Sequence, residues 1–313
     1  ADLRSHADAV AGGRPGMIVR PEQNWLRKLF SWHGSIMRKI SLQMLFFVGL
    51  NIAYLFILPI LHLHGIVAKE SPVYFIGVSI SIFLGFRNNV AWGRYSEARK
   101  LWGELLIVTR SLMREFINTS LASYEEKKAV VDLLIAYATV LKDTLRHEPA
   151  AAAMCEDRLV AGAGVMTPCN ALLQEIGLYL YHNRPDTRVY QNYNHYLNQI
   201  GMIQGGCERI SNTPIPFAYS LLLHRTVAIF CAIYPLLLIS NFGVLPLLFS
   251  LFTTYALLAL DAIATELEDP FGHEDNDLPL GAICNTIEID LREMMQDAEL
   301  PEKMRPDKHF RLL

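Results

Sequence analysis

Four long apolar blocks constrain the fold of this chain more than any other feature of its sequence. The first block, residues 40–61, holds no charged residue over about 22 positions, enough to cross a hydrocarbon layer of roughly 30 Å at about 1.5 Å per residue. Buried helices of soluble proteins are rarely this long and this apolar. The blocks therefore predict an all-α membrane protein with four transmembrane helices per subunit. The other three blocks cover residues 71–86, 219–239 and 242–260.

The blocks differ in how polar residues interrupt them. The second is the shortest and contains serine and glycine, the third carries His224 and Arg225 near its start, and the fourth is uncharged until Asp261. The first begins too far along the chain, and is too long, for a secretory signal peptide. We therefore interpret all four blocks as membrane spans.

The overall composition agrees with a membrane protein and narrows its partners. Charged residues make up 19% of the chain and hydrophobic residues 52%, against about 25% charged in soluble domains, which excludes a disordered chain. The net charge of -3 gives no basic field, so nucleic acid is not expected as a partner. The cysteines are odd in number and form no CxxC pair, which favours reduced thiols over a disulfide framework. They are Cys155, Cys169, Cys207, Cys231 and Cys284.

Lysine and arginine residues lie on one side of the predicted spans. They cluster before the first span and after the second, whereas the loop between those spans has only Lys69 and the turn at residues 240–243 has none. Because positively charged loops stay in the cytoplasm, both termini and the middle of the chain are expected there. The flanking basic residues are Arg20, Arg27, Lys28, Arg38, Lys39, Arg87, Arg94, Arg99 and Lys100.

The segments outside the spans complete a division into five parts. Residues 1–16 are small, polar and Gly-rich and precede Met17, which predicts a disordered leader or an expression remnant. Apolar residues recur at helical spacing up to about residue 210, where a last helix leads to Gly205 and Gly206. The expected parts are that leader (1–16), a region with the first two transmembrane helices (17–93), cytoplasmic helices (94–218), the other two transmembrane helices (219–264) and a cytoplasmic C-terminal segment (265–313).

No motif in the sequence indicates catalysis, so the chain is not expected to be an enzyme. Phosphate-loop, dinucleotide-binding, zinc-protease and hydrolase-elbow motifs are all absent. His62 and His64 lack further ligands and are interpreted as part of a hydrated loop rather than a metal site. Next to Cys207, an ion pair between Glu208 and Arg209 is favoured over a reactive thiol.

The second block has an unusual pattern on a helical wheel. Val78, Ile82 and Phe86 fall within about 80° of one another and form three apolar rungs about 12 Å long. Ser71 and Asn89 lie on the same stripe as polar positions at its two ends. The pattern fits an ordinary packed helix. It also fits a pore wall, in which symmetric copies of the chain stack three apolar rings that gate by dewetting.

Three motifs resemble the bestrophin family, specifically its bacterial branch. They are IFLGFRNNVAWGRYSEARKLWG at 82–103, QGGCERISNTPIPFAYSLLLHR at 204–225 and LEDPFGHEDNDLPL at 267–280. The resemblance extends from Met17 to about residue 295 and implies a homopentameric ion channel with four spans per subunit, cytoplasmic helices and one continuous pore. The implied partners are further copies of the chain, a lipid bilayer and permeant inorganic ions, in the inner membrane of a bacterium.

Residue roles follow from this resemblance. The family's neck consists of three apolar residues on the second span, four apart, which here are Val78, Ile82 and Phe86, the residues that the wheel also selects. The family's cytoplasmic aperture, on a later helix, corresponds to Tyr196. A hydrophobic gate at the neck is therefore expected.

The resemblance also implies where calcium would bind. In animal members a dense acidic run after DPFG, together with N-terminal carbonyls, holds calcium and couples it to the neck. Here the run is HEDND at 273–277, and two of its five positions are not acidic. Glu274, Asp275 and Asp277 are a degenerate equivalent of that clasp, so neither calcium nor another metal or cofactor is expected. A solvated acidic loop and a weak cation site both fit the run.

The neck does not carry the sign of the conducted ion, because apolar rings have no charge. Animal bestrophins resemble anion channels, whereas the bacterial branch implies monovalent cations, so a sodium or potassium channel is expected. A chloride channel of the same architecture is the alternative. A secondary transporter or a membrane-anchored scaffold fits less well, since no carboxylate pair marks a site at mid-membrane.

Overall fold

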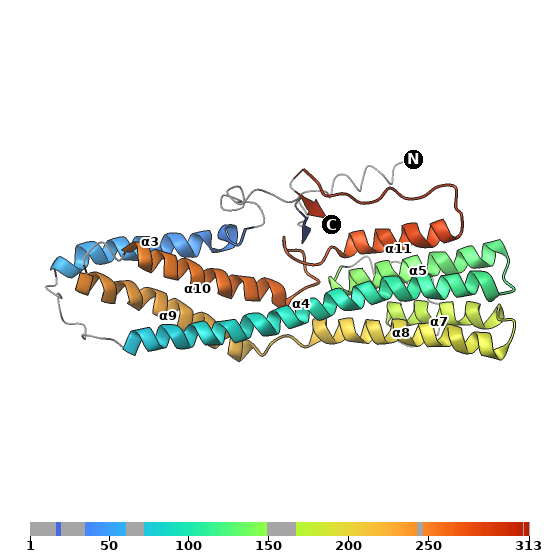
Figure 1. The fold of residues 1–313 in the computed structure, drawn as a ribbon, viewed down its shortest axis with the longest axis horizontal. Coiled ribbons are helices and arrows are strands. Elements are labelled where there is room, and N and C mark those ends of the chain that lie inside the picture. The colour runs from blue at the N-terminus through green and yellow to red at the C-terminus, as the bar shows by residue number, and fades with distance from the viewer. Residues whose placement is uncertain are drawn as a thin grey trace. The chain divides into compact units, whose positions relative to one another are not determined.

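The computed structural model describes residues 17–19, 35–60, 72–148, 167–242, 247–308 and 310–312. This part of the chain is mostly helical (Figure 1), which confirms the expected class at that level. Two short strands, β1 (Met17–Ile18) and β2 (Arg311–Leu312), accompany the helices. The helices are α3 (Met37–Ile60), α4 (Pro72–Thr119), α5 (Tyr124–Leu145), α7 (Pro168–His182), α8 (Thr187–Asn212), α9 (Phe217–Phe242), α10 (Leu247–Glu268) and α11 (Leu280–Met294).

The chain divides into two compact units. The span unit comprises Glu22–Tyr95 and Pro214–Asp269. The bundle unit comprises Ala1–Pro21, Ser96–Thr213 and Pro270–Leu313. Helix α4 contributes its residues up to Tyr95 to the span unit and the remainder to the bundle unit.

Three helices of the span unit are long and apolar enough to cross a membrane. They correspond to the first, third and fourth apolar blocks of the sequence. Only 17%, 33% and 39% of the residues in their most apolar stretches are buried, so most of their side chains face outward, as a lipid environment allows. The three spans are Met37–Ile57, Phe217–Leu238 and Leu247–Glu268.

The second apolar block is the beginning of α4, a helix of 48 residues. The helix continues through Arg87, Asn88 and Asn89, which end the apolar run without breaking the backbone hydrogen bonding. Among the residues that the structure describes, α4 is not one of the three candidate spans, and the start of the block, including Ser71, lies outside those residues. A fourth span therefore stays a prediction.

An apolar cluster joins the four helices of the span unit. Ile40 from α3, Leu84 from α4, Val227 from α9 and Leu257 from α10 are all buried in it. Gly77 permits a close approach of α4 to α9, because a Cβ atom there would lie 2.9 Å from the ring of Phe230. The side of α4 that carries Leu84 therefore belongs to the core of this unit.

Polar side chains inside the spans find hydrogen-bond partners within the span unit. Pro235 interrupts the hydrogen bonding of α9, and the hydroxyl of Tyr54 donates to the nearby carbonyl of Ala232 at 3.2 Å. Asn51 of α3 donates to the carbonyl of Phe47 at 2.7 Å. Its own amide oxygen accepts from Ser250 of α10 at 3.2 Å. Such pairing is expected where no water can replace a missing partner.

The bundle unit has a buried aromatic and aliphatic core. Helix α5 packs against α7, α8 and α11, and α7 also packs against α8. Ser123 and Glu126 form a reciprocal cap at the start of α5. The carboxylate of Asp186 caps α8 by accepting two backbone N–H groups. The largest fully buried side chains of this unit include Trp102, Leu112, Phe116, Tyr137 and Tyr193.

A polar network crosses this core. The Tyr137 hydroxyl donates to the amide oxygen of Gln204 at 2.9 Å. The amide nitrogen of Gln204 donates to Asn170 at 2.9 Å and to Glu208 at 2.7 Å. Burial raises the pKa of Tyr137, which keeps its hydroxyl a donor.

The structure corrects the extents of three segments. Helix α8 passes through Gly205 and Gly206. A Cβ atom at Gly206 would lie 2.9 Å from the side chain of Leu101, so the glycine leaves room for that side chain. Helix α10 continues beyond Asp261 to Glu268, because those acidic side chains are paired. The C-terminal segment, in which the sequence indicates only a short helix near residues 288–295, contains the 15-residue helix α11.

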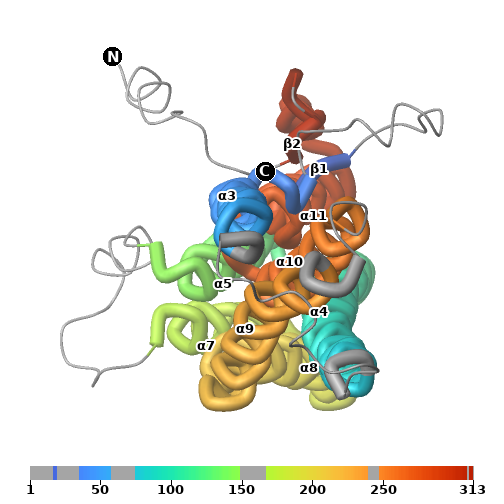
Figure 2. The backbone as a smooth tube through the Cα atoms, turned by 90° about the vertical axis from the view of Figure 1, so that its left-hand side faces the viewer, coloured from blue at the N-terminus to red at the C-terminus, as the bar shows by residue number. Residues whose placement is uncertain are grey.

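Strands β1 and β2 pair antiparallel, with Met17 opposite Leu312 (Figure 2). The N–H of Val19 donates to the carbonyl of Phe310 at 2.8 Å, and the N–H of Ile18 donates to that of Asp275 at 3.0 Å. The sequence indicates no strand here, because two residues are too few to show alternation. The predicted leader, residues 1–16, lies outside the described residues.

Candidate functional site

The predicted neck stripe occupies an open face of α4. Val78, Ile82 and Phe86 are 59%, 53% and 58% exposed, whereas Ile80 and Leu84 are buried in the core. The helix therefore packs on one side and leaves the stripe available to something outside the described chain. That geometry is compatible with a pore wall. Whether the stripe faces a central passage is not fixed by one chain, so the neck assignment stays a prediction.

Of the two polar residues predicted at the ends of the stripe, one lies among the described residues and one does not. Asn89 is exposed, one turn of α4 beyond Phe86. Ser71 lies outside the described residues. Only the Asn89 end of the predicted stripe can therefore be described.

A groove of about 450 Å³ borders the stripe within the span unit. Val78 and Ile82 line one wall from α4, and Phe230 and Leu257 contribute from α9 and α10. The lining is mostly apolar. Two of the three neck residues therefore border a space that a side chain from outside the chain could fill.

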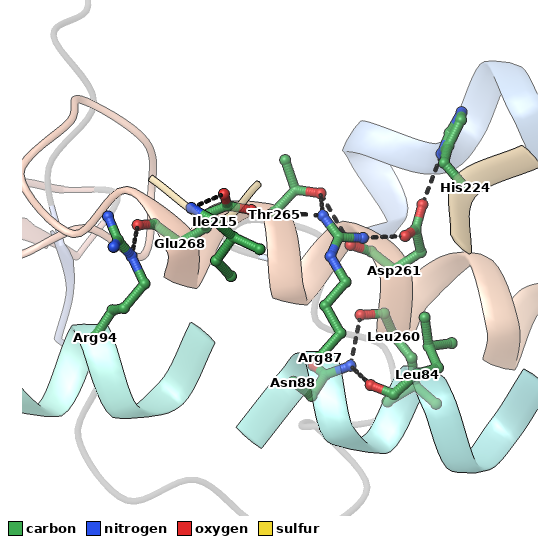
Figure 3. Close-up of polar contacts among 10 residues, drawn as sticks. All are labelled: Leu84, Arg87, Asn88, Arg94, Ile215, His224, Leu260, Asp261, Thr265 and Glu268. Atoms are coloured by element: carbon green, nitrogen blue, oxygen red, sulfur yellow. Dashed lines mark hydrogen bonds and ion pairs between the residues drawn. The ribbon is translucent and has the colours of Figure 1, made fainter. Parts of the chain in front are cut away.

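A buried ion pair follows the stripe directly in the sequence. Arg87 of α4 pairs with Asp261 of α10, and their side chains are only 4% and 7% exposed (Figure 3). Arg87 also donates to the hydroxyl of Thr265 at 3.1 Å and lies 3.6 Å from a carboxylate oxygen of Glu268. Buried charges need such partners, because removal from water costs several kcal/mol per ion, as an order-of-magnitude figure.

Further polar contacts tie α4, α9 and α10 together around this pair. His224 of α9 lies 2.7 Å, Nδ1 to Oδ2, from Asp261. Asn88 donates to the carbonyls of Leu84 at 2.9 Å and Leu260 at 3.1 Å. These contacts fix the turn of α4 that carries Phe86.

Glu268 closes the end of the same cluster. The Nε of Arg94 donates to the backbone carbonyl of Glu268 at 3.0 Å, and one carboxylate oxygen of Glu268 accepts from the N–H of Ile215 at 3.1 Å (Figure 3). In the sequence, Arg87 and Asp261 mark the ends of two apolar blocks, and their pairing was not predicted. The available signal was an arginine and an aspartate at the boundaries of two apolar blocks, where an unpaired charge is costly.

The predicted aperture residue, Tyr196, lies on α8 in the bundle unit. Its hydroxyl donates to a carboxylate oxygen of Glu115 at 3.2 Å. Burial and the nearby charge of Glu115 raise the pKa of Tyr196. Together with His195 it lines a groove of about 680 Å³ between α4 and α8. Its role as an aperture stays a prediction.

The acidic loop equivalent to the calcium clasp is engaged by groups of the chain itself. Asp277 accepts a hydrogen bond from the N–H of Glu274 at 2.6 Å. Asp275 lies 3.8 Å from Nε of Arg311 in β2. Carboxylates held this way do not form the converging set of oxygens that calcium requires. The residues present therefore do not fit the metal, and the expectation of no calcium stays a prediction.

The structure also shows the surroundings of the described cysteines and of the ion pair predicted beside Cys207. Burial raises the pKa of Cys207 and of Cys284 to about 12, so both are thiols at neutral pH. The predicted pairing of Glu208 with Arg209 is wrong, because Arg209 pairs with Glu97 of α4. Neighbouring residues on a helix point about 100° apart, which favours a partner on another helix. Cys155 lies outside the described residues.

Comparisons with known proteins reveal relatives over nearly the whole chain. Residues 17–293 match the family model described as bacterial/fungal bestrophin protein. The chain is similar to the voltage-dependent anion channel-forming protein YneE of Escherichia coli strain K12, with 44% identity over 95% of this chain and 100% of that protein. It is 37% identical to the voltage-dependent anion channel-forming protein mll4386 of Mesorhizobium japonicum, over 95% of this chain and 97% of the other.

The fold has close structural neighbours as well. A crystal structure of a bacterial bestrophin homolog from Klebsiella pneumoniae superposes with a TM-score of 0.77 and 34% sequence identity. The match covers 83% of this chain and 100% of that one. The arrangement of helices described above therefore occurs in an experimentally solved relative.

The names of these relatives contradict the expected ion. Relatives with 44%, 37% and 27% identity are all named as anion channel-forming proteins. The expectation of a sodium or potassium channel is therefore wrong, and the chloride alternative fits better. The physical reason for the error is that the apolar stripe carries no charge from which the ion sign could be inferred.

Proposed function

We propose, on the premise that this chain belongs to the bacterial and fungal bestrophin family, that it forms a homopentameric channel conducting small inorganic anions such as chloride. The family consists of channels rather than enzymes, in agreement with the absence of catalytic motifs in the sequence. The names of the relatives support the anionic selectivity, and the apolar spans support a location in a membrane.

The exposed stripe of Val78, Ile82 and Phe86 is the observation that carries this proposal. A helix in a single chain cannot enclose a water column, so several chains must each contribute one stripe around an axis. Five copies would stack three apolar rings over about 12 Å, measured along an α-helix. Such a constriction excludes water when narrow and passes ions when it widens.

The membrane topology follows from the same proposal. The first part of α4 serves as the fourth span. The basic residues that flank the spans place both termini on the cytoplasmic side of a bacterial inner membrane. Asn89 then lies at the cytoplasmic end of the neck.

Reconstitution of the purified protein in planar bilayers tests the proposal. Under asymmetric potassium chloride, the reversal potential is expected near the chloride equilibrium potential. Ile82→Ala removes bulk from the middle ring and should raise the single-channel conductance by about twofold or more, as expected for a hydrophobic constriction. The matched control is Ile76→Ala, an exposed isoleucine of α4 off the stripe, which should leave conductance unchanged.

Two results would contradict the proposal. A reversal potential near that of potassium would overturn the anionic selectivity. Equal effects of Ile82→Ala and Ile76→Ala on conductance would show that the stripe does not form the neck.

A further inference from the structure

The buried arginine of the span unit is mechanically linked to the neck. Arg87 follows Phe86 directly in α4, and neighbouring residues of a helix point about 100° apart. Phe86 is more than half exposed, whereas the side chain of Arg87 is buried against α10. A rotation of this turn of α4 cannot move one side chain without the other. Any rotation of this turn that follows a change of partner at Arg87 therefore also moves Phe86.

Arg87 has two carboxylates within reach on α10. It pairs with Asp261, and its Nη2 lies 3.6 Å from Glu268 (Figure 3). The two acidic residues are seven positions apart, or about 10 Å along the helix. The Nε of Arg87 has no hydrogen-bond partner among the described residues, so the guanidinium is not fully satisfied in its present position. Arg87 can therefore be drawn toward either carboxylate.

His224 acts on one of these carboxylates. Its Nδ1 lies 2.7 Å from Oδ2 of Asp261, whereas Arg87 binds Oδ1. The side chain of His224 is 53% exposed in the single chain, so the described residues of its own chain leave about half of it uncovered. Histidine is the side chain that ordinarily changes charge between about pH 5 and 8.

The remaining charges around His224 come from its own helix and from three others. On its own helix, Arg225 follows it in sequence. Lys39 of α3 is 3.6 Å from Glu266 of α10. The groups that face the cluster are Arg87 and Arg94 from α4, Asp261, Glu266 and Glu268 from α10, and Lys39 from α3. Histidine is the one residue type in this described set that ordinarily changes charge between about pH 5 and 8.

We propose that Asp261 is a positioning residue for the neck, acting through Arg87, and that the protonation of His224 sets how strongly Asp261 holds Arg87. This inference rests on the proposed channel function. With His224 neutral, its Nδ1–H donates to Asp261 and Arg87 supplies the balancing charge. When Nε2 gains a proton, the imidazolium balances Asp261, and the attraction on Arg87 shifts toward Glu268. The turn of α4 follows Arg87 and carries Phe86 with it.

The test is a pH profile of the current through the full-length protein in planar bilayers, with symmetric chloride, between pH 5.5 and 8.5. Wild-type conductance or open probability is expected to change by about threefold or more over this range, as for a two-state element biased by one proton. His224→Gln keeps a hydrogen-bonding side chain without the titration, and should flatten the profile while current persists. The matched control is His182→Gln, at the end of α7 in the bundle unit, which should leave the profile unchanged.

Asp261→Asn tests the positioning residue itself. It keeps the shape of the side chain and removes the charge that His224 and Arg87 share, so it should flatten the profile in the same way. Because this variant leaves Arg87 short of a partner and can prevent folding, Arg87→Lys provides a second variant that keeps the charge but not the two-pronged contact, and it should shift the profile rather than remove it.

The outcomes separate the inference from the proposed function. Absence of wild-type current at every pH overturns the channel and the inference together. A channel whose pH profile survives His224→Gln, or is lost in His182→Gln, overturns the inference and leaves the channel standing. A profile that survives Asp261→Asn shows that His224 acts without Asp261, and this also overturns it.

Discussion

The span unit and the bundle unit satisfy their buried polar groups in different ways. In the span unit the buried contact is between full charges, Arg87 and Asp261, with His224 at its edge. In the core of the bundle unit, the contact from Tyr137 to Gln204 joins two uncharged side chains. A charge without its partner costs far more in a low-dielectric interior than a dipole without its partner. The difference teaches that the span unit keeps a costly charged contact directly after the predicted neck residue Phe86, whereas the Tyr137 contact of the bundle unit involves no charge.

The largest expected effect comes from breaking the charged contact. Arg87→Ala leaves Asp261 buried with only His224 beside it, and should lower the free energy of unfolding by about 3–5 kcal/mol. The measurement is thermal or denaturant unfolding of the purified protein in detergent. The control is Arg99→Ala, an exposed arginine on the same helix, which should change stability by about 0.5 kcal/mol or less. Equal losses in the two variants would contradict the special status of the buried pair.

The neutral contact should be weaker. Tyr137→Phe removes the hydroxyl and leaves the amide oxygen of Gln204 without that donor, which should lower the free energy of unfolding by about 1–3 kcal/mol. Tyr124→Phe is the matched control, because its hydroxyl donates to Asp297 at the surface, and it should cost about 0.5 kcal/mol or less. If Tyr137→Phe costs as much as Arg87→Ala, the contrast between the units disappears.

The smallest effect is expected at the acidic loop of the bundle unit. Millimolar calcium should leave the unfolding temperature and the current unchanged, because Asp275 and Asp277 are already held by Arg311 and by a backbone N–H group. A bound ligand at about 100 times its Kd would stabilise the protein by about 2.7 kcal/mol. A rise in unfolding temperature with calcium but not with magnesium would contradict this expectation.

The local parts of this fold could be predicted from the sequence. Three apolar blocks are helices because length and apolarity are local properties, and spacing alone places Val78, Ile82 and Phe86 on one face of α4. Tyr137 and the other core residues of the bundle unit lie on helices that periodicity indicates. The family could be recognised from three motifs, and the comparisons bear it out.

The contacts between distant segments could not be predicted. Arg87 and Asp261 are 174 positions apart, and Arg209 pairs with Glu97 across 112 positions. The role of the glycines in α8 depends on a distant neighbour, because Gly206 leaves room for the side chain of Leu101. The ion sign was wrong for a related reason, because an apolar neck leaves selectivity to charges elsewhere.

Strands β1 and β2 have a practical consequence for anyone who modifies this protein. Each strand is two residues long, and each has the other as its pairing partner. Deletion of Arg311 and Leu312 would remove the strand that pairs with Met17 and Ile18. It would also remove the guanidinium group that lies beside Asp275. A truncation or insertion that removes either strand therefore leaves the other without its pairing partner.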